Sequence, residues 1–252
     1  EALRSHPSDP RVLAMALGRR IEPEQRAQQI ARLKESAPDN ALGNYLAALD
    51  LFKAKQPAQA LQELTAAAGK RTLDDYAMAP QQAGEEMQLL AGRSPIEARA
   101  SSMFGLLLPL VSELSGLSKE MAALQKDYLA RNDTASAESL AITAQQLARQ
   151  ISQGPSSGLL IEQLVASAVE KCLLENLNPT TANPALGQTP AERLAALKAQ
   201  RDEIKILTTT LDPLNENTTL TEPELLVYLE RMKTQGELNA LRWLNAQRTN
   251  AP

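Results

Sequence analysis

The side chains that most often carry catalysis are scarce in this sequence. His6 is the only histidine and precedes Pro7, so imidazole acid–base chemistry and histidine metal ligation lack a second residue to build on. Cys172 is the only cysteine and lies in an apolar run, where a thiol serves as a small core residue more often than as a nucleophile. The sequence therefore predicts no catalytic residue, no cofactor and no metal site.

Adjacent carboxylates are a second kind of candidate for acid–base or calcium chemistry. Three such pairs occur: Asp74 and Asp75, Glu85 and Glu86, and Asp202 and Glu203. Neighbouring residues on a helix point about 100° apart, and no Asp-rich loop surrounds any of the pairs, so we interpret them as solvated faces.

Two aromatic residues are candidates for partner binding instead. Tyr76 lies in LDDYAM and Trp243 lies in LRWL, and large aromatics concentrate binding energy at interfaces. For Trp243 the alternative is core packing, because leucines recur around it at helical spacing.

Charge and hydropathy exclude several classes of partner. The net charge is −4, with acidic and basic residues mixed throughout, which does not suit nucleic acid. The longest apolar run, MFGLLLPLV, is about half the length of a membrane-spanning helix, so we predict no transmembrane segment. The chain begins with Glu1, which leaves open a removed signal or anchor and an extracytoplasmic, envelope-associated location.

The elements that must position these residues are helices. The apolar residues are mostly Ala and Leu, with two Phe, four Tyr and one Trp, and this composition favours helices over strands. Ser94, Thr189 and Thr221 are each followed three residues later by Glu, a helix-capping pattern. Apolar residues fall three or four apart from Ala137 to Ile151, on one face of a helix. We predict an all-α fold without a sheet.

The expected helices and domains follow from these signals. Helices are predicted over about 9–19, 22–36, 39–54, 57–69, 72–79, 81–91, 94–115, 118–131, 133–152, 156–177, 189–210, 221–235 and 237–248. Residues 178–188 are rich in turn formers and predict a loop. The expected organisation is helical repeats over 1–70, a helical continuation over 71–177, the loop, and C-terminal helices over 189–252, packed on the same domain.

Residues 36–70 read as two short helices around the corner Lys55-Gln56-Pro57. Small and large residues alternate at Ala48, Leu51, Ala60 and Leu64, and a shift of 34 residues aligns this unit with residues 7–40, where Arg26 replaces the small residue of the second helix. A weaker echo occurs at Tyr128 to Leu147, with a corner at 131–133 and Ala137 as the small residue. The period is that of a helical repeat.

Residues 7–72 thereby resemble the tetratricopeptide repeat, a helix-turn-helix unit of 34 residues. The resemblance implies stacked hairpins in a right-handed array, because one hairpin cannot bury both of its faces alone. It also implies a partner surface lined by the first helices of the units, which makes Asn44, Tyr45, Leu51 and Lys55 candidate binding residues.

Three functions are left open by the sequence. The first is a non-enzymatic scaffold that binds a protein or a peptide. The second is an envelope-associated structural component tethered through a missing N-terminal segment. The third is an enzyme that uses carboxylates or a metal in a cleft between helices, which would require several buried acids around one cavity.

Overall fold

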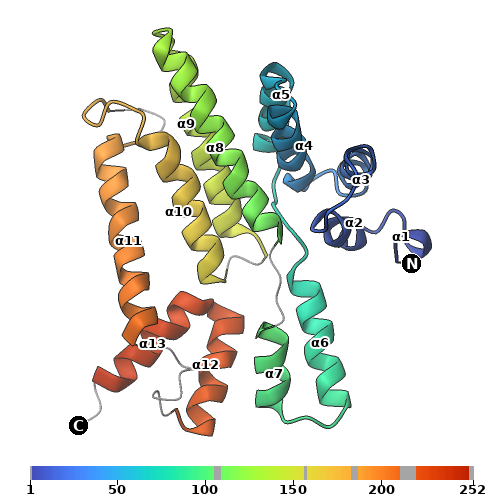
Figure 1. Ribbon diagram of the computed structural model, residues 1–252. Coiled ribbons are helices and arrows are strands. Elements are labelled where there is room, and N and C mark those ends of the chain that lie inside the picture. The colour runs from blue at the N-terminus through green and yellow to red at the C-terminus, as the bar shows by residue number, and fades with distance from the viewer. Residues whose placement is uncertain (1, 105–108, 156–157, 183–186, 211–219, 250–252) are drawn as a thin grey trace.

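A computed structural model describes residues 2–104, 109–155, 158–182, 187–210 and 220–249. These residues form helices and connecting loops with no strand, so the predicted all-α fold is confirmed (Figure 1). The helices are α1 (Ala2–Ser5), α2 (Pro10–Leu17), α3 (Pro23–Ser36), α4 (Leu42–Lys53), α5 (Pro57–Ala68), α6 (Met78–Leu90), α7 (Pro95–Phe104), α8 (Pro109–Ala130), α9 (Thr134–Gln153), α10 (Leu160–Leu174), α11 (Pro190–Thr210), α12 (Glu222–Gln235) and α13 (Glu237–Thr249).

The predicted cap motifs begin helices as expected. In the motif before α7, the Glu97 backbone N–H donates to Ser94 Oγ at 3.3 Å, and the Ser94 N–H donates to the Glu97 carboxylate at 3.1 Å. The corresponding pair before α11 is made by Thr189 and Glu192. Thr221 and Glu224 form a third capping box before α12. Each box satisfies N–H groups that have no partner inside the helix.

The helix predicted over residues 72–79 is wrong. Residues 72–77 are a loop and α6 begins at Met78, because side chains satisfy the loop backbone. The Asn40 side chain donates to the Asp74 carbonyl at 2.7 Å and accepts the Asp74 N–H at 3.1 Å. The Tyr76 and Ala77 N–H groups donate to the carboxylates of Asp74 and Asp75. Hydrogen bonds to side chains therefore take the place of helical backbone bonds in this segment.

The predicted boundary between helices near residue 116 is also wrong. The helix expected over 94–115 is α7 followed by a new helix, α8, which begins at Pro109, since proline lacks the N–H that a helix interior needs. Gly116 lies inside α8 and faces Leu49 of α4, whose Cδ atoms would lie 3.9 Å from an added Cβ, an ordinary contact distance.

Hairpins of neighbouring helices build the core. The α4–α5 hairpin packs against α8 and α9 (Figure 1). Together with α10, these helices form the largest apolar cluster among the described residues. The paired small residues Ala48 and Ala60 are fully buried in it. The stripe predicted on α9 is buried as expected: Ala137, Leu140, Ala144, Leu147 and Ile151.

A second apolar cluster joins α2 and α3 to α4 and to the start of α8. Beside it, the Arg26 side chain of α3 binds α4 and α8. Its guanidinium donates to Asp50 of α4 at 2.7 Å and to Glu113 of α8 at 3.0 Å. The residue that departs from the repeat pattern therefore ties three helices together, with its side chain 14% exposed.

The C-terminal helices add a separate apolar cluster made by α11, α12 and α13 with Leu160. Helix α11 lies along α10, where Arg193 forms two hydrogen bonds to the buried Glu170 carboxylate at 2.6 and 2.8 Å. The turn between α12 and α13 crosses the start of α10, where the Gly236 and Gly158 backbones meet so closely that a Cβ on Gly236 would lie 3.2 Å from Gly158 Cα.

The α6–α7 hairpin stands apart from this packing. It is inserted between α5 and α8, and it extends away from the α4–α5 hairpin toward α12 (Figure 1). Within the described residues it contributes nothing to any of the apolar clusters. Its position must therefore depend on other contacts.

Candidate binding groove

A cavity of about 440 Å³ lies where the α6–α7 hairpin faces the N-terminal helices. We call it the binding groove. Its lining residues come from α2, the 75–77 loop, α6, α7 and the start of α8: Ala14, Met15, Gly18, Arg19, Asp75, Tyr76, Ala77, Pro80, Gln81, Gly84, Gln88, Ser101, Ser102 and Leu110. Its size falls in the range of sites that bind small molecules or the anchor side chains of peptides.

Helix α2 supplies one wall of the groove. Leu13, Ala14 and Leu17 bury the inner stripe of this helix in the second cluster, which turns the neighbouring Met15 outward. The Met15 side chain is 51% exposed at the groove. A thioether chain is flexible and polarizable, which suits an adaptable binding surface.

Tyr76 lines the groove in a strained conformation. Its φ is 58°, in the left-handed region that a residue with a side chain rarely adopts. Its hydroxyl accepts a hydrogen bond from the Asn40 Nδ2 at 3.3 Å, and partial burial raises the pKa of the phenol. Such strain is maintained only when the surrounding structure imposes it, and it concentrates at functional sites.

Helix α6 and the residue before it line the groove through Ala77, Pro80, Gly84 and Gln88, at spacings of three or four. Ala77 and Gly84 are small, whereas Gln88 brings a polar amide to the same wall. A Cβ on Gly84 would lie 3.8 Å from Ser102 Cβ, an ordinary contact distance between packed helices. The Ser101 and Ser102 hydroxyls donate to carbonyls of their own helix, at 2.7 Å to Glu97 and 2.9 Å to Arg99.

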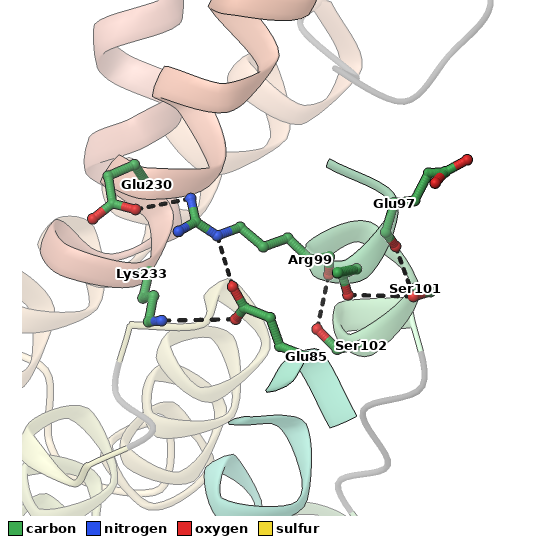
Figure 2. Close-up of polar contacts among 8 residues, drawn as sticks. Glu85, Glu97, Arg99, Ser101, Ser102, Glu230 and Lys233 are labelled. Carbon is green, nitrogen blue, oxygen red and sulfur yellow. Dashed lines mark hydrogen bonds and ion pairs between the residues drawn. The ribbon is translucent and has the colours of Figure 1, made fainter. Parts of the chain in front are cut away.

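An ionic cluster fixes the hairpin that carries this wall. Figure 2 shows Arg99 of α7 between Glu85 of α6 and Glu230 of α12, at 2.8 Å from each carboxylate. Lys233 of α12 approaches the second Glu85 oxygen at 3.7 Å. The Glu85 side chain is only 11% exposed, and its contact with Arg99 raises the pKa of the guanidinium. We call these four residues the clasp.

Two of the predicted partner-binding residues lie in the interior. Tyr45 is fully buried, burial raises its pKa, and its hydroxyl donates to Gln150 of α9 at 2.5 Å. Asn44 is 3% exposed and donates to Glu63 of α5 at 2.7 Å, while its Oδ1 has no hydrogen-bond partner among the described residues. Both side chains hold helices together and present no accessible surface.

The other predicted residues are spread over the molecule. Leu51 is partly buried against the main cluster, and Lys55 is exposed at the α4–α5 corner with φ 61°. Trp243 is half-buried beside the C-terminal cluster, with Arg231 over its ring at 5.0 Å from the centroid. Of the predicted six, Tyr76 is the residue that lines the groove.

Sequence reasoning missed the residues that complete the groove. Met15 and the lining residues of α6 come from helices about 60 residues apart, and nothing in the local sequence predicts that they line one cavity. One usable signal was present: Met15 is a large apolar residue placed outside the buried stripe Leu13, Ala14 and Leu17.

The described residues show no cluster of three or more His, Cys, Asp or Glu side chains that could hold a metal ion. Burial raises the pKa of the Cys172 thiol, a direction that disfavours the reactive thiolate. No helix among the described residues is long and apolar enough to cross a membrane. An upstream anchor and an extracytoplasmic location stay predictions.

The comparisons with known proteins add no relative. No protein-family model matches this chain, and neither a curated protein nor a solved structure matches it. The resemblance to tetratricopeptide repeats therefore depends only on the sequence pattern of residues 7–72, and the groove is the feature from which a function can be inferred.

Proposed function

We propose that this chain is a non-enzymatic helical scaffold that binds a peptide segment of another protein in the groove between α2 and the α6–α7 hairpin. The observation that carries the proposal is the strained, half-buried Tyr76 in the lining of a cavity of about 440 Å³. The left-handed conformation of a tyrosine costs about 1–2 kcal/mol. Four hydrogen bonds made by the side chains of Asn40, Asp74 and Asp75 hold the loop in this conformation.

The shape of the groove supports a peptide as the ligand. Helix α2 contributes the exposed thioether of Met15. Helix α6 contributes Gly84 and Pro80, with the amide side chains of Gln81 and Gln88 beside them. An apolar anchor inserted between such walls is the usual basis of peptide recognition by helical grooves. The paired hairpins α4–α5 and α8–α9 support the scaffold part of the proposal, since stacked hairpins form extended surfaces.

Selection from a random peptide library displayed on phage, with the intact chain as bait, tests this function. Selected peptides are then synthesised, and their dissociation constants are measured by fluorescence anisotropy. We expect Met15→Asp to weaken binding about tenfold or more, because a carboxylate replaces an apolar contact at a central position.

The matched control is Met87→Asp. Met87 is 70% exposed on α6 but does not line the groove, so the same substitution there leaves the dissociation constant unchanged. A library that yields no binder, or binders that are indifferent to Met15→Asp, would overturn the proposed function.

A further inference from the structure

A second cavity adjoins the binding groove at the end of α2. It measures about 620 Å³ and shares Gly18 and Arg19 with the groove. Its other lining residues come from the 20–27 segment, α4 and the start of α8: Leu17, Arg20, Ile21, Pro23, Arg26, Ala27, Asp50, Lys53, Ser112 and Glu113. An extended chain that follows the surface can therefore pass from one cavity to the other beside Arg19.

The charged side chains of the two cavities do not balance. Asp50 and Glu113 are both engaged by Arg26, and Lys53 approaches Glu113 at 3.9 Å. In the groove itself, the Asp75 carboxylate accepts the Ala77 backbone N–H at 3.0 Å. The two cavities together are lined by four basic and three acidic side chains.

Two guanidinium groups remain beside the cavities: Arg19 lines both of them, and Arg20 lines the second. Arg19 and Arg20 are exposed, and neither forms a side-chain hydrogen bond or an ion pair with any residue that the structure describes. They present positive charge on a chain whose net charge is −4. A guanidinium binds a carboxylate through two parallel hydrogen bonds, which a lone ammonium cannot do.

We infer that the bound segment is a short acidic peptide, with an aliphatic or aromatic side chain in the groove and a neighbouring carboxylate on Arg19 or Arg20. This inference rests on the proposed function and specifies its partner. The apolar anchor supplies most of the affinity, whereas the arginines set the direction of the chain and select against basic segments.

The peptides selected with the intact chain provide the first readout. We expect aspartate or glutamate to be enriched next to the apolar anchor position. We also expect binding of the selected peptides to weaken as salt concentration rises, because exposed charges are screened.

A charge-swap experiment provides the decisive readout. In the double variant Arg19→Glu and Arg20→Glu, affinity for a selected acidic peptide should fall about tenfold. This is the change expected when two exposed attractive charge interactions become repulsive. A synthetic peptide with lysine in place of each acidic residue should bind this variant better than the original chain. Rescue of this kind cannot arise from damage to the fold.

The control double variant is Arg32→Glu and Arg93→Glu. Both arginines are exposed and line neither cavity, so the same change in net charge is made away from the junction. We expect the affinity of the selected peptide to stay within about twofold of the original value.

The outcomes separate the two proposals. If Met15→Asp abolishes binding but the selected peptides lack acidic residues, or the double variant binds them normally, the inference is overturned and the proposed function stands. If binding is indifferent to Met15→Asp, the groove is not the site and both are overturned. Selection of basic peptides would also overturn the inference.

Discussion

Three helices end on the same backbone motif, in which one residue adopts a left-handed conformation. At the end of α4 the Gln56 N–H donates to the Leu51 carbonyl and the Lys55 N–H donates to the Phe52 carbonyl, which is the Schellman pattern. The same bonds end α6 and α8, where the left-handed residues are Gly92 and Asn132. Lysine is the least suited of the three to a φ of 61°.

Replacing Lys55 by glycine should stabilise the protein. The left-handed conformation costs a residue with a Cβ about 1–2 kcal/mol, part of which is offset by the greater freedom of glycine in the unfolded chain. We expect a net gain of about 0.5–1 kcal/mol in the free energy of unfolding, measured by urea denaturation.

Two further variants check this explanation. Lys55→Ala keeps the Cβ and should give no gain, whereas Gly92→Ala should lose about 1 kcal/mol at the equivalent position. A gain with Lys55→Ala equal to that with Lys55→Gly would show that removal of the lysine charge, and not the backbone conformation, is responsible.

Glu237 is a half-buried carboxylate whose protonation affects stability. Its Oε2 accepts the Leu160 N–H at 2.9 Å at the start of α10, and burial raises its pKa above the ordinary glutamate value of 4.5. A carboxyl group whose pKa is raised by folding stabilises the folded state most at low pH. This contribution is complete below pH 4.5 and is lost as the pH rises through the raised pKa.

The Glu237→Gln variant should therefore be more stable than the original chain at pH 7, and the two should converge below pH 4.5. Urea denaturation at a series of pH values measures both curves. The exposed Glu86 provides the control, because Glu86→Gln makes the same change at the surface and should alter the free energy of unfolding at pH 7 by less than about 0.5 kcal/mol. A Glu237→Gln variant that is less stable by the same amount at every pH would contradict the argument.

At the scale of elements, two arginine–glutamate pairs with similar geometry join helices in different surroundings. Arg193 binds Glu170 at 2.6 and 2.8 Å between α11 and α10, where the Glu170 side chain is 3% exposed. Arg242 binds Glu203 at 2.7 and 2.9 Å between α13 and α11, where the Glu203 side chain is 40% exposed. Removing an arginine leaves a buried charge in the first case and a hydrated one in the second.

The Arg193→Met substitution should cost about 3 kcal/mol in the free energy of unfolding, because the Glu170 charge loses its partner inside the protein. The matched Arg242→Met substitution should cost less than about 1 kcal/mol. Equal losses in the two variants would contradict the role of burial. In the double variant Glu170→Met and Arg193→Met, much of the loss should be recovered, since no buried charge remains.

At the scale of the whole molecule, the clasp couples the C-terminal helices to the binding groove. The α6–α7 hairpin has no apolar cluster of its own among the described residues. Arg99 joins α7 to α6 through Glu85 and to α12 through Glu230, and Lys233 of α12 approaches Glu85. The same hairpin supplies one wall of the groove. A partner bound in the groove would therefore respond to contacts made by α12.

The Arg99→Met substitution should release the hairpin while leaving the core intact. We expect backbone amides of residues 78–104 to exchange with solvent about tenfold faster or more, because opening the hairpin no longer breaks two ion pairs. Amides of α9 should keep their protection. Hydrogen exchange followed by mass spectrometry measures both regions.

Arg93→Met serves as the control for the clasp. Arg93 is exposed at the tip of the hairpin and makes no ion pair with a described residue, so its removal should not alter exchange. If Arg99→Met and Arg93→Met behave alike, the clasp does not hold the hairpin. A loss of protection in α9 as well would show that the hairpin and the core unfold together.

Much of the fold could be predicted from local sequence. The Thr221-x-x-Glu224 pattern and the Ala137 to Ile151 stripe mark a helix start and a buried face, because capping and periodicity involve residues within one or two turns of each other. The α4–α5 hairpin and its corner at Lys55 were equally visible. The loop over 72–77 was not, since its backbone bonds go to Asn40, more than thirty residues away.

The candidate site also has features that the sequence predicts and features that it does not. Composition alone indicated helices, the scarcity of catalytic side chains and the unsuitability for nucleic acid, because these depend on which residues are present. Tyr76 could be singled out by type, but its left-handed strain and its place at a cavity could not. The sequence also made Asn44 and Tyr45 candidates for binding, yet the packing of α5 and α9 over them turned both into interior hydrogen-bonding groups.

The groove, the clasp and the junction at Arg19 were decided by tertiary structure alone. Each joins residues from helices far apart in the chain, as when Arg99 binds Glu230 or when Met15 and Gly84 line one cavity. Local sequence patterns determine where single helices and hairpins form, because capping and periodicity act between residues close in the chain. Which exposed faces then oppose one another depends on how the α6–α7 insertion is placed against the stacked hairpins, and that placement is set by long-range packing and ion pairs.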